Sequence, residues 1–147
     1  MDFNDLIADF AARHAVADLA ADGDSAALDV DGIAVTLVAA NGQLAATAEI
    51  GEPPAEGAAA FADLLLEANL ASETFFAKTP ETGQYVAVRR LPLPSLDPDT
   101  FDAALESLVN LAETWRRLLA DFRPAAQAAE ESNAPLPAFG ANGFMPV

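Results

Sequence analysis

Few residues in this chain have side chains that could do covalent chemistry. It has one histidine, His14, and no cysteine. A histidine that activates a nucleophile needs a serine or threonine beside it in space and an acid that orients its ring. Nothing in the sequence marks such groups, and no glycine-rich phosphate loop is present. We therefore expect no catalytic residue and no enzyme, and we interpret His14 as a position at the edge of a packed helix.

Four aspartates lie close together in the sequence, at Asp22, Asp24, Asp29 and Asp31. A calcium loop of the EF-hand type needs another Asp or Asn two positions after Asp24, where this chain has an alanine. Aspartate is also common at the ends of loops and in Asp-Gly turns. We therefore expect turn residues here, no metal site and no cofactor.

The charge of the chain is strongly negative and unevenly distributed. The 147 residues include 23 acids and 7 bases, for a net charge of −16. Residues 1–77 hold fourteen acids and one base, whereas residues 78–123 hold seven acids and six bases. Phosphate contacts need Lys and Arg, so we expect no nucleic-acid partner. The acidic first half is explained either by solubility alone or by attraction to a basic polypeptide.

The sequence carries no sign of export or of a membrane anchor. It opens with MDFNDLIADF, which is acidic where a secretory signal needs basic residues. No apolar run is long enough to span a bilayer. The lack of cysteine fits a reducing compartment. We therefore expect a cytoplasmic protein without membrane insertion.

The first half of the sequence predicts one helix followed by three antiparallel strands. Apolar residues recur at three- and four-residue steps in the segment 2–20, which indicates an amphipathic helix. Asp31-Gly32 and Asn41-Gly42 are two-residue hairpin signals. They divide the next segment into strands at 26–30, 33–39 and 43–50, whose alternating apolar residues predict one buried face.

The second half predicts a helix, two more strands and a last helix. The helix at 57–71 contains LLLEANL and is apolar on nearly all sides, so it must be covered twice. The sheet covers one side, and a second copy of the chain is the simplest cover for the other. Strands at 73–79 and 84–91 follow, and Asp97-Pro98 begins a helix that runs to Phe122.

These elements predict an α+β fold with the order α-β-β-β-α-β-β-α. A twisted antiparallel sheet would pack against the helices, in a homodimer. The folded domain is expected over residues 1–123. Residues 124–147 mix Pro, Gly, Ala and Asn without helical or strand periodicity after Glu131, and we predict a flexible C-terminal tail there.

The order and the local sequence of these elements resemble the class I type III secretion chaperones of bacteria, the Tir-chaperone-like family. LLLEANL resembles the end of the family's dimer helix, and LAETWRRLL resembles its closing helix with the tryptophan. TGQYVAVRRLPLPSLDPDTFDAAL resembles its turn, strand, LPL connector and capped last helix. The resemblance covers residues 2–122. It implies a homodimer that binds the extended, unfolded N-terminal segment of a secreted effector without ATP and keeps it competent for export.

The resemblance also implies two sets of site residues. The dimer interface is expected on the second helix, at Phe61, Leu64, Leu65, Ala68 and Leu70. The client-binding surface is expected on the first helix and the sheet, at Phe3, Leu6, Ile7, Phe10, Ile33, Val35 and Leu37. About half of these seven are expected to be core, because apolar stripes usually are. Two alternatives stay open: an interaction or regulatory module of the same fold that binds a folded protein partner, and a small enzyme.

Overall fold

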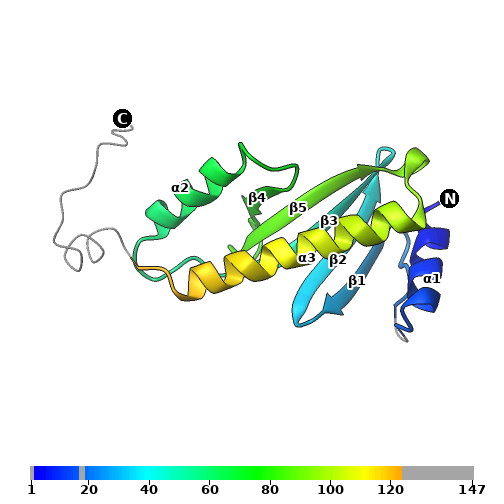
Figure 1. Ribbon diagram of the computed structural model, residues 1–147, viewed down its shortest axis with the longest axis horizontal. Coiled ribbons are helices and arrows are strands. Elements are labelled where there is room, and N and C mark those ends of the chain that lie inside the picture. Colours follow the sequence, from blue (N-terminus) through cyan, green and yellow to red (C-terminus); the bar gives the residue numbers. More distant parts are fainter. Residues whose placement is uncertain (1, 17–18, 124–147) are drawn as a thin grey trace.

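The structure is a computed structural model that describes residues 2–16 and 19–123 (Figure 1). The tail predicted at 124–147 lies outside the described residues. Within them, helices and strands follow each other in the predicted order, which confirms the α+β fold class. Their bounds are α1 Phe3–Arg13, β1 Ser25–Val30, β2 Ile33–Ala40, β3 Gln43–Gly51, α2 Ala58–Ala68, β4 Phe75–Lys78, β5 Tyr85–Pro92, η1 Leu93–Ser95 and α3 Pro98–Ala120.

The strands form one antiparallel sheet in the order β1-β2-β3-β5-β4. Asp31 and Asn41 each have a φ of 54°, and the glycines that follow them have φ values of 84° and 76°. Two successive positive φ angles are what a two-residue type I′ turn requires. Both predicted hairpins are therefore confirmed, and β1, β2, β3 and β5 lie within one residue of their predicted bounds.

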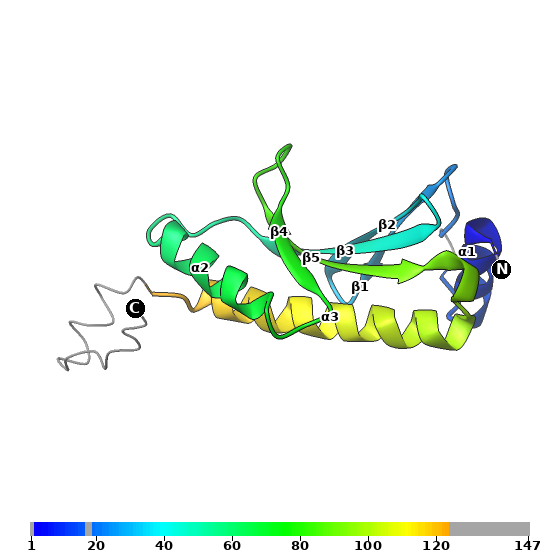
Figure 2. The same cartoon turned by 90° about the horizontal axis from the view of Figure 1, so that it is seen from above.

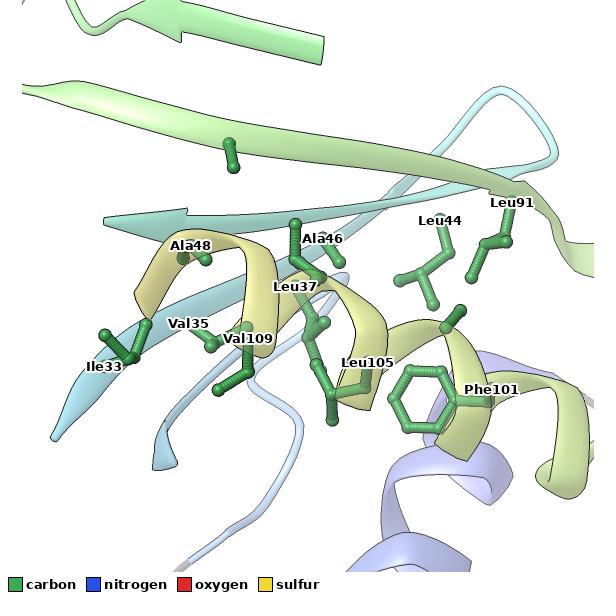
Figure 3. Close-up of a cluster of buried hydrophobic side chains, with 14 of the residues drawn as sticks. Ile33, Val35, Leu37, Leu44, Ala46, Ala48, Leu91, Phe101, Leu105 and Val109 are labelled. Atoms are coloured by element: carbon green, nitrogen blue, oxygen red, sulfur yellow. The ribbon is translucent and has the colours of Figure 1, made fainter. Parts of the chain in front are cut away.

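The long helix α3 covers one face of the sheet (Figures 1 and 2). It begins as predicted, because the Asp97 carboxylate accepts a hydrogen bond from the Thr100 N–H at 2.7 Å and Pro98 occupies the first turn. Leu37 and Leu44 of the sheet and Phe101 of α3 are at most 1% exposed. The core lies between these two layers (Figure 3).

Helix α1 is shorter than the predicted segment 2–20. The Asp2 carboxylate caps its start by accepting from the Asp5 N–H at 2.8 Å. It ends at Arg13, since Ala15 has a φ of 54° and the Val16 N–H donates to the Ala11 carbonyl at 3.0 Å, which closes the helix as in a Schellman motif. Periodicity did not reveal this end because the left-handed residue is an alanine.

Helices α1 and α2 lie at opposite ends of α3 (Figures 1 and 2). Helix α2 ends at Ala68, before the predicted residue 71, and β4 covers only Phe75–Lys78 of the predicted 73–79. Both differences come from the connection between them. There the side chains of Asn69 and Ser72 accept backbone N–H groups at the start of β4, where we had predicted further helix and strand.

Candidate protein-binding surfaces

The inner side of α2 is anchored by aromatic side chains. Phe61 is fully buried, and its ring centroid lies 5.5 Å from that of Tyr85, 5.9 Å from Trp115 and 5.1 Å from Phe122. Leu65, one turn later, is 5% exposed. These contacts fix α2 to β5 and to the C-terminal half of α3. Phe61 and Leu65 therefore pack into the core of their own chain, and their part in a dimer interface stays a prediction.

The outer side of α2 carries leucines that its own chain leaves uncovered. Leu64 and Leu70, both predicted at the interface, are 44% and 91% exposed, and Ala68 is half-buried. Leu66 is 64% exposed and was missed by the prediction. The sequence does contain a signal for Leu66. Small and apolar residues recur at three- and four-residue steps along one helix face, at Ala59, Ala62, Leu66 and Leu70.

A groove of about 350 Å³, here called the α2–β4 groove, opens beside Leu66. Its lining is mostly apolar and consists of Pro53, Ala58, Ala59, Ala62, Leu65, Leu66, Phe76, Ala77, Lys78 and Tyr85. Lys78 is the one charged residue in this lining. Burial raises the pKa of Tyr85, so its phenol stays neutral, and it donates to the Ala58 carbonyl at 3.4 Å. The groove fits apolar side chains of another polypeptide.

The predicted client-binding residues lie in the core. All seven are at most 8% exposed, namely Phe3, Leu6, Ile7, Phe10, Ile33, Val35 and Leu37. Figure 3 shows Ile33, Val35 and Leu37 directed from β2 toward α3. The expectation that about half of the set would be exposed is therefore wrong in this structure. Contact of these side chains with a client stays a prediction.

One of the seven, Phe10, does border a second groove. This α1–α3 groove has a volume of about 360 Å³ and lies between α1, the β1–β2 turn and α3. Its lining is Phe10, His14, Val30, Asp31, Asp102, Leu105, Glu106, Val109 and Asn110. An apolar floor thus meets three carboxylates, which favours an occupant with both apolar and basic side chains.

Ionic contacts join α1 to α3 beside this groove. Arg13 binds both carboxylate oxygens of Asp102, with Nη2 to Oδ1 at 3.0 Å, and its Nε binds Asp9 at 2.6 Å. His14 Nε2 lies 3.1 Å from Asp102 Oδ2. Hydrogen bonds from Arg13 hold the pKa of Asp102 below its usual range. Within the described part of the chain, His14 contacts Arg13, Asp102 and the Phe10 ring, and none of these three carries a hydroxyl group.

The four clustered aspartates lie in or beside two turns, with Asp24 and Asp31 in the turns, Asp22 in a β-bridge and Asp29 in β1. The Gly32 N–H donates to Asp29 Oδ1 at 2.9 Å, inside the first hairpin. Across residues 2–16 and 19–123, no three His, Cys, Asp or Glu side chains stand close enough together to hold a metal ion. Over the same residues, no helix has both the length and the apolarity needed to cross a bilayer.

Comparison with known proteins found the same fold in several solved structures. A chain of the ExsC–ExsE complex superposes with a TM-score of 0.70 at 26% identity, over 86% of this chain and 99% of that one. A chain of the HopA1–SchA chaperone–effector complex gives a TM-score of 0.66 at 18% identity, over 78% and 93%. The Yersinia pestis type III secretion chaperone SycH, solved with a fragment of YscM2, gives 0.63 at 19% identity, over 78% and 99%.

A search of curated proteins found no match. A family model, in contrast, matches residues 5–116, which is most of the chain. The matched range includes α2 and β4 beside one groove and most of α1 and α3 beside the other. The resemblance inferred from LLLEANL, the LPL connector and the tryptophan-bearing last helix is confirmed by this match. The chain belongs to the Tir chaperone protein (CesT) family.

Proposed function

We propose that this protein is an ATP-independent cytoplasmic chaperone that binds the extended, unfolded N-terminal segment of a type III secretion effector and keeps it competent for export. The family match over residues 5–116 is the observation that carries the proposal. It is supported by the similar fold of a chain in the HopA1–SchA chaperone–effector complex. The activity is binding alone, so it needs no catalytic residue and no cofactor.

The proposed working form is a homodimer joined through the outer side of α2. Support comes from Leu66 and Leu70, which continue the apolar strip that Ala59 and Ala62 begin beside the α2–β4 groove. A strip of this kind on a soluble monomer usually marks an interaction surface. In a two-fold dimer the same strip serves both copies, which lets each leucine strip pack into the partner's groove.

The α1–α3 groove is the proposed place for part of the client. An extended polypeptide could lay apolar side chains on Leu105 and Val109, and basic side chains against Asp31 and Glu106. The outer backbone of the edge strand β1 is not paired with another described strand, so a client strand can add there. Apolar client residues held in this way are kept from associating with each other.

The test uses the purified protein and the two halves of an effector from the same bacterium. The N-terminal segment should bind with micromolar or tighter affinity, and binding should weaken as salt is raised. The double variant Asp31→Asn/Glu106→Gln should bind more weakly than wild type. The matched control Glu52→Gln/Glu56→Gln removes two exposed charges from the β3–α2 loop and should bind normally. Binding of the folded C-terminal half alone would instead favour a module for a folded partner.

A further inference from the structure

Strand β4 is an edge of the sheet and carries two phenylalanines. It pairs with β5 on one side only, in the register Phe75↔Val88, Phe76↔Ala87 and Ala77↔Val86. The ladder continues with the Thr79 N–H donating to the Gln84 carbonyl at 2.9 Å. Because backbone groups alternate along a strand, the odd-numbered residues here face β5, and Thr74, Phe76 and Lys78 turn their N–H groups outward. An unprotected apolar edge of this kind recruits other strands.

Two side chains already bond three of the outward backbone groups of this edge. Asn69 Oδ1 accepts from the Phe76 N–H at 2.7 Å, and Asn69 Nδ2 donates to the Phe76 carbonyl at 3.4 Å. One amide thus offers Phe76 the acceptor and the donor that a neighbouring strand would offer. Ser72 Oγ accepts from the Thr74 N–H at 3.0 Å. The remaining outward position is Lys78, an exposed lysine, and charge of this kind also discourages pairing.

We propose that the side chains of Asn69 and Ser72 cap the β4 edge, so that no second polypeptide adds a strand there. With the β4 edge capped, a second polypeptide can contact this end of the molecule only through side chains. Strand addition is therefore directed away from the dimer face. It also explains the polar Asn that follows LLLEA at the end of α2, because its amide bonds the edge strand β4. This inference does not depend on the chaperone function, because it concerns only the hydrogen bonding at one edge of the sheet.

The first test is amide hydrogen exchange measured residue by residue. Asn69→Ala should speed exchange at Phe76 by about tenfold, the loss of one hydrogen bond. Asn69→Asp keeps the acceptor oxygen, so exchange at Phe76 should stay as slow as in wild type. Ser72→Ala should act on Thr74 and leave Phe76 unchanged. The control Asn4→Ala changes an exposed Asn on α1 and should leave both amides unchanged.

The second test asks whether a strand can add. The probe is a fluorescent peptide with the sequence of residues 73–79, and a second copy is N-methylated at alternate residues so that it cannot pair. The unmodified peptide should bind Asn69→Ala/Ser72→Ala and not wild type, and the methylated peptide should bind neither.

Three results would overturn the proposal: equal binding of the unmodified peptide to wild type, unchanged exchange at Phe76 in Asn69→Ala, or equally fast exchange in Asn69→Asp. Should the double variant fail to fold, the exchange rates of Ser72→Ala and Asn69→Asp still test whether these two side chains cap the β4 edge.

Discussion

Replacing Leu66 by aspartate tests the proposed dimer face with a calculable effect. Leu66 is 64% exposed in the single chain and borders the α2–β4 groove. Fully burying a leucine contributes about 2 kcal/mol, so covering its exposed part in both copies contributes about 2.5 kcal/mol. Leu66→Asp removes this free energy of burial. It also places two carboxylates in the contact, and each costs several kcal/mol to desolvate. The dissociation constant should therefore rise by at least about a thousandfold, which corresponds to roughly 4 kcal/mol.

The measurement is the molar mass in solution by light scattering at micromolar concentration. Wild type should be a dimer and Leu66→Asp a monomer with an unchanged circular dichroism spectrum, since the side chain is outside the core. Leu118→Asp is the matched control, because Leu118 is 49% exposed on α3 and is not part of the groove. The reasoning is refuted if Leu66→Asp stays dimeric, or if Leu118→Asp dissociates equally.

Three further changes have expected results. Ala15→Gly should raise the free energy of unfolding in urea by about 0.5 kcal/mol. The φ of 54° strains alanine by about 1 kcal/mol, and relief of this strain is partly offset because glycine has more conformational entropy in the unfolded chain. A lower free energy of unfolding would contradict the prediction. Asp102→Asn should be less stable than wild type at neutral pH. A lowered pKa contributes stability above the unfolded value of about 3.9 that is lost as pH falls through the folded value, so the difference should vanish in acid; a difference that persists there would show another cause. Deleting residues 124–147, which carry Phe139 and Phe144, should tighten client binding and raise dye binding if this apolar segment competes for a groove; unchanged values would refute competition.

Local sequence was enough to predict most of the fold. The Asp-Gly and Asn-Gly pairs specify two-residue turns because each places two residues at positive φ, and those turns fix the register of β1, β2 and β3. Asp97-Pro98 marks the start of α3 through a cap and a fixed φ. The end of α1 could not be predicted, since alanine carries no signal for the left-handed conformation that Ala15 adopts.

The candidate surfaces were predicted less well, for a different reason. An apolar stripe shows that a helix face is covered but not by what. Phe10 was expected to face a client, yet its ring packs edge-on against Phe101 with the centroids 5.4 Å apart. On α2, the chain's own aromatic residues cover Phe61, while Leu66 stays exposed. The two hydrogen bonds of Asn69 to β4 depend on a contact seven residues away, which periodicity does not encode.

The most direct test of the central claim is hydrogen exchange of the client within its complex with this protein. The client is isolated with the chaperone from the native host, and its amides are compared bound and released. The proposal predicts that the bound N-terminal segment is protected only in short separate stretches, without the continuous protection of a folded domain, and that ATP does not release it. A client that is protected throughout as a folded domain, or that is released by ATP, would contradict the account.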